Sequence, residues 1–182
     1  MNLFAQKVIA VVLNNEGGFQ KHPSDPGNWT GPNCTGELIG TKYGIAARYF
    51  PNYDIPNLTV DEATEIYYTH WWLRMGLWGI NNDELVLQVF DFGVNAGKRR
   101  SVRTIQRVVG AEPDGICGPI TRGRINLFRP AVKKENGREV TYTSYDFFKQ
   151  ARKSYYIDLA NRKPSMKVFL NGWLNRIEKT HF

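Results

Sequence analysis

Apolar side chains recur at helical spacing through most of the chain. Residues 3–15 are mostly apolar, and the pair Gly17-Gly18 that follows predicts the end of a helix there. The same spacing predicts further helices over 83–96, 100–109, 120–128, 144–162 and 166–179. Strand signals are few. The pattern therefore predicts a mainly α fold.

The stretch between the helices predicted at 3–15 and 83–96 begins with a segment that lacks helical spacing. Residues 19–42 are rich in glycine and proline, which predicts a long loop or a small β-hairpin. A short helix is expected over 43–50, and Thr59 and Glu62 form a capping-box pattern for a helix running to about Leu77. Long loops inside compact domains usually carry function, so we expect functional residues in the segment 19–42.

Charge and composition narrow the class of protein. The net charge of +7 favours anionic partners, which include nucleic acid, anionic membranes and an anionic cell wall. No helix-turn-helix, RNA-recognition or zinc-finger pattern is present, so we expect no nucleic-acid partner. Cys34 and Cys117 have no metal-site spacing and the three histidines are scattered, so neither a metal nor a cofactor is expected. A disulfide between the two cysteines stays open.

Glu16 stands at the end of the first predicted helix, in Asn-Asn-Glu-Gly-Gly. A helix carries partial negative charge at this end, and apolar neighbours reduce the hydration of a carboxylate. Both effects favour the protonated carboxyl, which is the form that a general acid needs. The alternative is a surface glutamate before a helix cap.

Asp25 follows nine residues later in Pro-Ser-Asp-Pro-Gly. Solvent and turn amides on a loop favour its ionised form. Two carboxylates in opposite environments are typical of glycoside cleavage, where one protonates the leaving oxygen and the other activates water or stabilises the transition state. Asp-Pro-Gly is also a common turn, so a role in bracing the loop stays open.

Three motifs in this region resemble the glycoside hydrolase family 108 lysozymes, which occur as phage endolysins and bacterial secretion-activator proteins. The motifs are Glu16-Gly-Gly-Phe, Asp25-Pro-Gly-Asn-Trp-Thr and Gly40-Thr-Lys-Tyr-Gly-Ile. The resemblance implies a lysozyme-like, two-lobed helical fold with Glu16 as the catalytic acid. Similarity to the broader lysozyme superfamily implies Asp25 as the second carboxylate and Thr41 as the residue that places water. An insertion of roughly residues 31–39 separates Asp25 from Thr41.

Four further residues are expected to contact sugar. Tyr43 lies in the third motif, and Asp91 and Asn95 lie one helical turn apart in Phe-Asp-Phe-Gly-Val-Asn-Ala-Gly, which also matches the family. Trp72 offers a ring for stacking. Each has a structural alternative, because a polar residue in an apolar helix needs partners and a tryptophan at helical spacing often belongs to the core.

The second half of the chain resembles peptidoglycan-binding helical modules. The pattern begins at Gln106 and continues in Asp114-Gly-Ile-Cys-Gly-Pro-Ile-Thr121, whose turn residues also suit a scaffold loop between helices. The resemblance implies a lysozyme-like catalytic region at 1–95. It also implies a helical peptidoglycan-binding region at 96–182, packed into the same compact unit.

Together these features predict a monomeric muramidase of the endolysin type that cleaves the β-1,4 bond between N-acetylmuramic acid and N-acetylglucosamine. A lytic transglycosylase using the same glutamate and a non-catalytic wall-binding protein are the alternatives. No secretory signal pattern and no membrane-spanning apolar stretch are seen in the sequence. We therefore expect synthesis in the host cytoplasm and action in the periplasm or cell wall after release.

Overall fold

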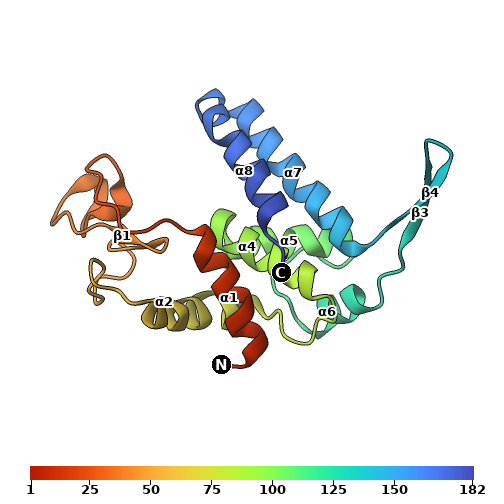
Figure 1. The fold of residues 1–182 in the computed structure, drawn as a ribbon, viewed down its shortest axis with the longest axis horizontal. Coiled ribbons are helices and arrows are strands. Elements are labelled where there is room, and N and C mark those ends of the chain that lie inside the picture. Colours follow the sequence, from red (N-terminus) through yellow and green to blue (C-terminus); the bar gives the residue numbers. More distant parts are fainter. The chain divides into compact units, whose positions relative to one another are not determined.

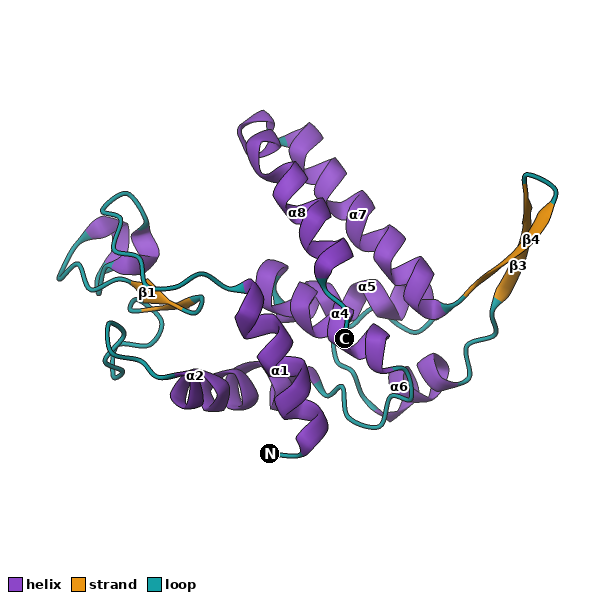
Figure 2. Cartoon of the chain, viewed as in Figure 1, coloured by secondary structure: helices purple, strands orange, loops and turns teal.

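A computed structural model describes all 182 residues, which divide into two compact units, Met1–Tyr68 and Thr69–Phe182. Helices dominate the second unit, the first unit combines two helices with a long loop, and the only strands form two short antiparallel hairpins (Figure 2). The predicted mainly α fold is confirmed. The division falls after Tyr68, whereas the sequence suggested a boundary after residue 95 within one compact unit.

The first unit is built on two helices, α1 (Leu3–Asn15) and α2 (Val60–Tyr67), which contact each other. Helix α1 has the predicted limits, and its N-terminus is capped by the Asn2 side chain, which accepts from the Ala5 amide at 2.8 Å. The capping box at the start of α2 is confirmed, with Thr59 and Glu62 bonded reciprocally. The core of this unit contains Ala5, Val8, Ile9, Val12, Ile45, Ile55, Leu58, Ala63, Ile66 and Tyr67.

The segment between these helices is a loop, as predicted, with 3₁₀ turns at Pro26–Asn28 and Pro32–Cys34. It leads into a hairpin of strands β1 (Thr41–Lys42) and β2 (Ile45–Ala46), so the short helix expected over 43–50 is wrong. Tyr43 and Gly44 form the turn with φ of 51° and 70°, the conformation of a type I′ hairpin. Ile45 and Ala47 are buried while Ala46 is half-buried, and this alternation over a short apolar run belongs to a strand.

The second unit is an assembly of helices around α4 (Asp83–Ala96). Residues 85–93 of α4 are all buried, and α4 packs against α5 (Lys98–Val108) and α7 (Ser144–Arg162). Helix α8 (Lys167–Lys179) lies beside α7 (Figure 1). The remaining helical segments are a π-helical turn at Tyr68–Trp72, α3 (Leu73–Met75), α6 (Pro119–Asn126) and a 3₁₀ turn at Pro164–Met166. The helix expected from Thr59 to Leu77 is therefore interrupted after Tyr67.

The second hairpin was not predicted. Strands β3 (Ala131–Glu135) and β4 (Arg138–Tyr142) pair in antiparallel register around Asn136-Gly137, which have φ of 49° and 79°. Asn-Gly is a strong type I′ hairpin signal. The charged residues of both strands are exposed, and the sequence here lacks the alternation of apolar and polar residues that predicts a strand.

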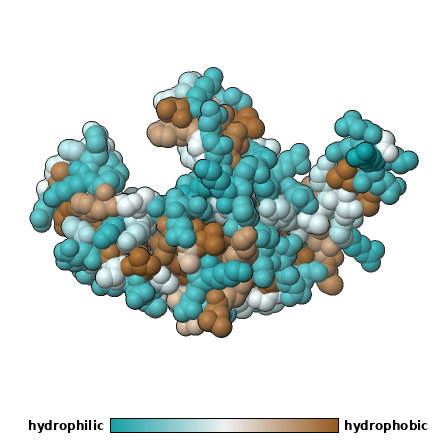
Figure 3. Space-filling view, in the orientation of Figure 1, coloured by the Kyte–Doolittle hydropathy of each residue, from teal (hydrophilic) through white to brown (hydrophobic).

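Apolar side chains are also exposed where α7 and α8 are joined. Ile157, Val168 and Phe169 are exposed there, and Figure 3 shows hydrophobic atoms at this end of the helix pair. These side chains lie outside the core of the unit.

Candidate active site

The Glu16 carboxyl group lies against the turn of the first hairpin. Glu16 caps the C-terminal end of α1, and its amide donates to the Leu13 carbonyl at 3.1 Å. A Cβ atom built on Gly44 would lie 2.8 Å from Glu16 Oε2 and 3.0 Å from the Tyr67 hydroxyl oxygen. A side chain at position 44 would displace the carboxyl group, and the φ of 70° there favours glycine.

The hairpin turn is fastened from two sides. The Tyr67 hydroxyl donates to the Tyr43 carbonyl at 2.9 Å, and the Tyr43 amide donates to the Gly17 carbonyl at 3.1 Å. The first bond ties the turn to α2, and the second ties it to the residue that follows Glu16. The site predicted for Glu16 and Tyr43 is thus assembled from α1, α2 and the hairpin. The Tyr43 ring is half-buried, with Lys42 Nζ 5.5 Å from its centroid.

Asp25 and Thr41 belong to one hydrogen-bond network. Gln20 Nε2 donates to Asp25 Oδ2 at 2.9 Å and to Asn28 Oδ1 at 3.1 Å. The Thr41 hydroxyl donates to the same Asn28 oxygen at 2.6 Å. The structure therefore brings these two predicted residues together through Gln20 and Asn28, across the insertion that separates them in sequence.

Asn28 is the centre of this network. It is fully buried, and its Nδ2 donates to Gln20 Oε1 at 2.8 Å and to the His22 carbonyl at 3.0 Å. Its carbonyl accepts from the Ile39 and Gly40 amides. A buried asparagine with its polar atoms bonded fixes the conformation of the backbone around it. Asn28 thus holds the loop in register with β1.

Both oxygens of Asp25 are engaged. Oδ1 accepts from the Gly27 amide at 2.9 Å and caps the 3₁₀ turn, while Oδ2 accepts from Gln20. These bonds support bracing of the loop, and each carboxylate oxygen keeps a lone pair for a further donor. The catalytic assignments of Asp25 and Thr41 stay predictions.

Sequence reasoning missed Gln20 and Asn28. Asn28 lies inside the Asp25-Pro-Gly-Asn-Trp-Thr motif, and Gln20 directly follows the Glu16-Gly-Gly-Phe motif. Nothing in their spacing indicated that they would meet. Gln20 and Thr41 pair through two backbone hydrogen bonds of 2.9 Å, in which the amide of each residue donates to the carbonyl of the other.

In the second unit, Asp91 occupies the buried core. Its side chain is 0% exposed and forms ion pairs with Arg152, also 0% exposed, and with Arg176 at 2.7 Å. Arg152 also donates to the buried Gln88, which in turn donates to the Ile177 and Thr180 carbonyls. This polar cluster joins α4, α7 and α8. Its geometry gives Asp91 a structural role, and the sugar-binding role stays a prediction that the burial does not favour.

The other two predicted sugar contacts differ in exposure. Trp72 is buried and packs edge-to-face on Phe90, with the ring centroids 5.7 Å apart, so it lies in the core as in its structural alternative. Asn95 is exposed, and its Oδ1 accepts from the Tyr156 hydroxyl. Of the three predicted sugar contacts in this unit, only Asn95 is exposed at the surface, where a ligand could reach it.

The pattern from Gln106 to Thr121 forms a scaffold. Gln106 is buried, and its Nε2 donates to Asp114 Oδ1 at 2.7 Å and to the Thr121 hydroxyl at 3.1 Å. Its Oε1 accepts from the Gly115 amide at 2.9 Å. The hydrogen bond from Gln106, together with one from the Ile116 amide, lowers the pKa of the Asp114 carboxyl. The hydrogen bonds of Gln106 therefore hold the loop before α6 against α5.

Cys34 and Cys117 are free thiols. Burial raises the pKa of Cys117 to about 11. No histidine, cysteine and acidic side chains cluster in a way that suits a metal ion. None of the helices has the length and apolar character that crossing a bilayer requires.

Comparison with known proteins finds a matching family for each half of the sequence. The family model of glycosyl hydrolase 108 matches residues 9–97, and a family described as a predicted peptidoglycan domain matches residues 100–178. Among solved structures, SagA of Brucella abortus is similar at 23% identity with a TM-score of 0.68, over 97% of this chain and 90% of that chain. A comparison with curated protein sequences found no match.

The two family matches adjoin and cover most of the sequence, and the SagA likeness shows that the fold is shared along nearly the whole chain. They support a glycoside hydrolase with a lysozyme-like action on peptidoglycan. Residues 9–97 of the chain belong to glycosyl hydrolase family 108, and a peptidoglycan domain follows at residues 100–178.

Proposed function

We propose that the chain is a muramidase that hydrolyses the β-1,4 bond between N-acetylmuramic acid and N-acetylglucosamine, with Glu16 as the general acid. The observation that carries the proposal is the Glu16 carboxyl group at the end of α1, held beside Gly44. Tyr67 and Gly17 fasten the turn on which Gly44 lies. Glycine at position 44 keeps side-chain atoms of the turn away from the carboxyl group.

The mechanism requires Glu16 to protonate the leaving oxygen as the glycosidic bond breaks. A second group then directs water at the anomeric carbon or stabilises the positive charge that develops there. We place Asp25 and Thr41 in this second role, because Gln20 and Asn28 hold them in one network. Loss of proton transfer by a general acid slows catalysis by about 10²–10⁴-fold.

Glu16→Gln tests the central assignment. The variant keeps the shape of the side chain but cannot supply a proton of suitable acidity, so release of soluble sugar from purified peptidoglycan should fall about 100-fold or more. Glu37→Gln is the matched control, because Glu37 is an exposed glutamate of the same unit. Equal clearing of cell walls by wild type and Glu16→Gln would overturn the assignment of Glu16, whereas binding to walls without sugar release by the wild type would favour the non-catalytic, wall-binding alternative.

Product mass separates hydrolysis from transglycosylation. A hydrolase leaves a reducing N-acetylmuramic acid end, whereas a lytic transglycosylase leaves a 1,6-anhydro end that is lighter by one water. We expect the reducing end. Asp25→Asn then tests the second carboxylate, since a general base would lose activity far beyond any loss of stability and a bracing residue would lose both together.

The site of action follows from the substrate. We place the enzyme at the cell wall or in the periplasm, in an endolysin role, and its net charge of +7 favours approach to an anionic wall. Lysis of cells that express the chain only when a membrane pore is co-expressed would support this role. Lysis without a pore would contradict it.

A further inference from the structure

Helix α5 presents a set of cations without ion-pair partners. Val102 and Ile105 face the core, and the basic residues of the helix are Lys98, Arg99, Arg100, Arg103 and Arg107. None of these five takes part in an ion pair. Like charges gathered on one helix repel each other, and an anionic ligand relieves that repulsion.

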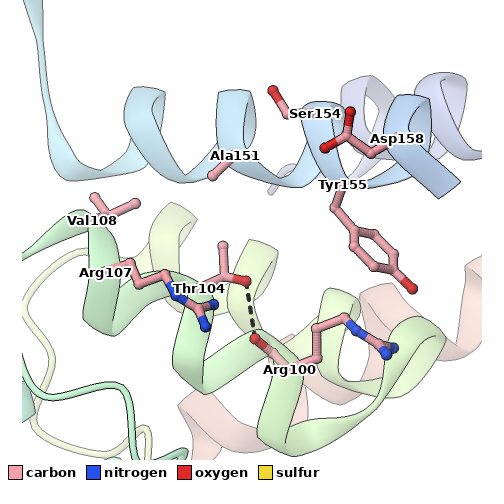
Figure 4. Close-up of a pocket in the computed structure, with 8 residues that line it drawn as sticks. All are labelled: Arg100, Thr104, Arg107, Val108, Ala151, Ser154, Tyr155 and Asp158. Carbon is pink, nitrogen blue, oxygen red and sulfur yellow. Dashed lines mark hydrogen bonds between the residues drawn. The ribbon is translucent and has the colours of Figure 1, made fainter.

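A cavity of about 500 Å³ lies between α5 and α7. Arg100 and Arg107 line it from α5, and Tyr155 and Asp158 line it from α7 (Figure 4). The same two arginines also line a second cavity of about 510 Å³, which extends to Arg103. Volumes of this size are typical of small-ligand sites.

The lining of the α5–α7 cavity is mixed in chemistry. The Arg100 guanidinium carbon stands 4.8 Å from the centroid of the Tyr155 ring, and its Nη1 donates to the Ala96 carbonyl, so the group is held in place. Its remaining donors are free for a carboxylate. Val108 and Ala151 add apolar surface, and Asp158 adds one negative charge.

This mixture selects among anionic partners. A uniform polyanion such as nucleic acid would meet repulsion from Asp158. A short peptide that carries carboxylates and an amino group fits better, because its carboxylates can pair with the arginines and its ammonium with Asp158. Stem peptides of peptidoglycan have this composition, and the cavity lies within the residues that match the peptidoglycan domain.

We propose that the α5–α7 cavity binds the stem peptides of peptidoglycan, with Arg100 and Arg107 receiving carboxylates and Asp158 receiving an amino group. The inference rests on the proposed function only in taking peptidoglycan as the substrate. It assigns recognition of the peptide to a site separate from the residues that cleave the glycan.

Sedimentation with purified sacculi tests the proposal. The full chain carrying Glu16→Gln is used so that the sacculi stay intact, and soluble sugar is measured in the same tubes, so continued cleavage reveals a failure of the proposed function separately. Adding Arg100→Ala and Arg107→Ala should weaken binding about tenfold, since two solvent-facing ion pairs each contribute a factor of a few. Arg129→Ala with Lys134→Ala removes the same charge at exposed positions outside the cavity and should change binding less than about twofold.

Two chemically altered ligands and one further variant sharpen the result. Sacculi with amidated carboxylates, and sacculi stripped of stem peptides by an amidase, should each bind the parent about tenfold more weakly than native sacculi. Asp158→Asn should weaken binding to native sacculi, whereas a site for polyanions would bind more tightly after this change. Unchanged binding to altered sacculi, tighter binding by Asp158→Asn, or displacement of the protein by duplex DNA would overturn the proposal. Circular dichroism confirms that each variant is folded.

Discussion

The Thr41 hydroxyl donates to Oδ1 of the fully buried Asn28 at 2.6 Å. This bond joins the first residue of β1 to the last residue of the 3₁₀ turn that Asp25 caps. The strand and the capped turn flank the insertion of residues 31–39. The position of Asp25 relative to β1 therefore depends on Asn28.

Replacement of the two partners should affect stability unequally. Thr41→Val removes one hydroxyl and should lower the free energy of unfolding by about 1 kcal/mol, whereas Asn28→Ala removes a buried side chain with four hydrogen bonds and should cost about 2–3 kcal/mol. Urea denaturation measures both. Thr41→Ser, which keeps the hydroxyl, serves as the control. A Thr41→Val variant as stable as wild type would show that the bond contributes nothing.

Gly44→Ala should damage activity more than stability. Gly44 has φ of 70°, and an added Cβ would stand 2.8 Å from Glu16 Oε2. The backbone strain costs about 1–2 kcal/mol, and displacement of the carboxyl group should lower the rate of peptidoglycan cleavage at least tenfold. Gly18→Ala is the matched control, because nothing lies within 4 Å of its added Cβ. Similar rates for the two variants would separate Gly44 from the site.

Asp91→Ala should destabilise the second unit strongly. It would leave Arg152 buried without its carboxylate partner, and breaking such a pair costs about 3–5 kcal/mol. Asn95→Ala, at an exposed position on the same helix, should cost about 1 kcal/mol or less. Thermal denaturation together with binding to sacculi checks this. An Asp91→Asn variant of normal stability but weak binding would restore the sugar-contact role.

The two cysteines should differ in reactivity. Cys117 is buried with a pKa raised to about 11, so native protein treated with iodoacetamide at pH 8 should be labelled at Cys34 only, and unfolded protein at both. As the pH rises, the Cys117 thiol loses its proton near its ordinary pKa of 9.0 in the unfolded chain but only near pH 11 in the folded protein. The free energy of unfolding should therefore fall between about pH 9 and 11. Cys34→Ser should abolish native labelling. Labelling of both thiols in folded protein would contradict the burial of Cys117.

The helices could be predicted because their signals are local. Apolar spacing marks α4 and α7, whose limits agree with the expected ranges. The hairpins are harder to predict, because strands of two to five residues give too short a pattern to separate from a helical one. At β3 and β4 the Asn-Gly turn was the available signal, and the charged flanking residues obscured it.

The candidate site was predicted unevenly for a related reason. Glu16 could be located because its motif and its helix end coincide in sequence. Gln20 and Asn28 act by contacting residues 5 to 21 positions away in the sequence, and such contacts leave no periodic pattern. Asp91 and Trp72 show the reverse case, since both were expected to contact sugar yet are buried.

Helix α4 limits how this protein can be recombined. It lies within residues 9–97, which match glycosyl hydrolase 108, but residues 85–93 are enclosed in the second compact unit. A gene fusion cut at residue 98 would deprive the peptidoglycan domain of its central helix and expose apolar surface on both fragments. Exchange of cell-wall specificity between such enzymes should succeed only at junctions near Tyr68. The inherited sequence modules and the units that fold are therefore different divisions of the same chain.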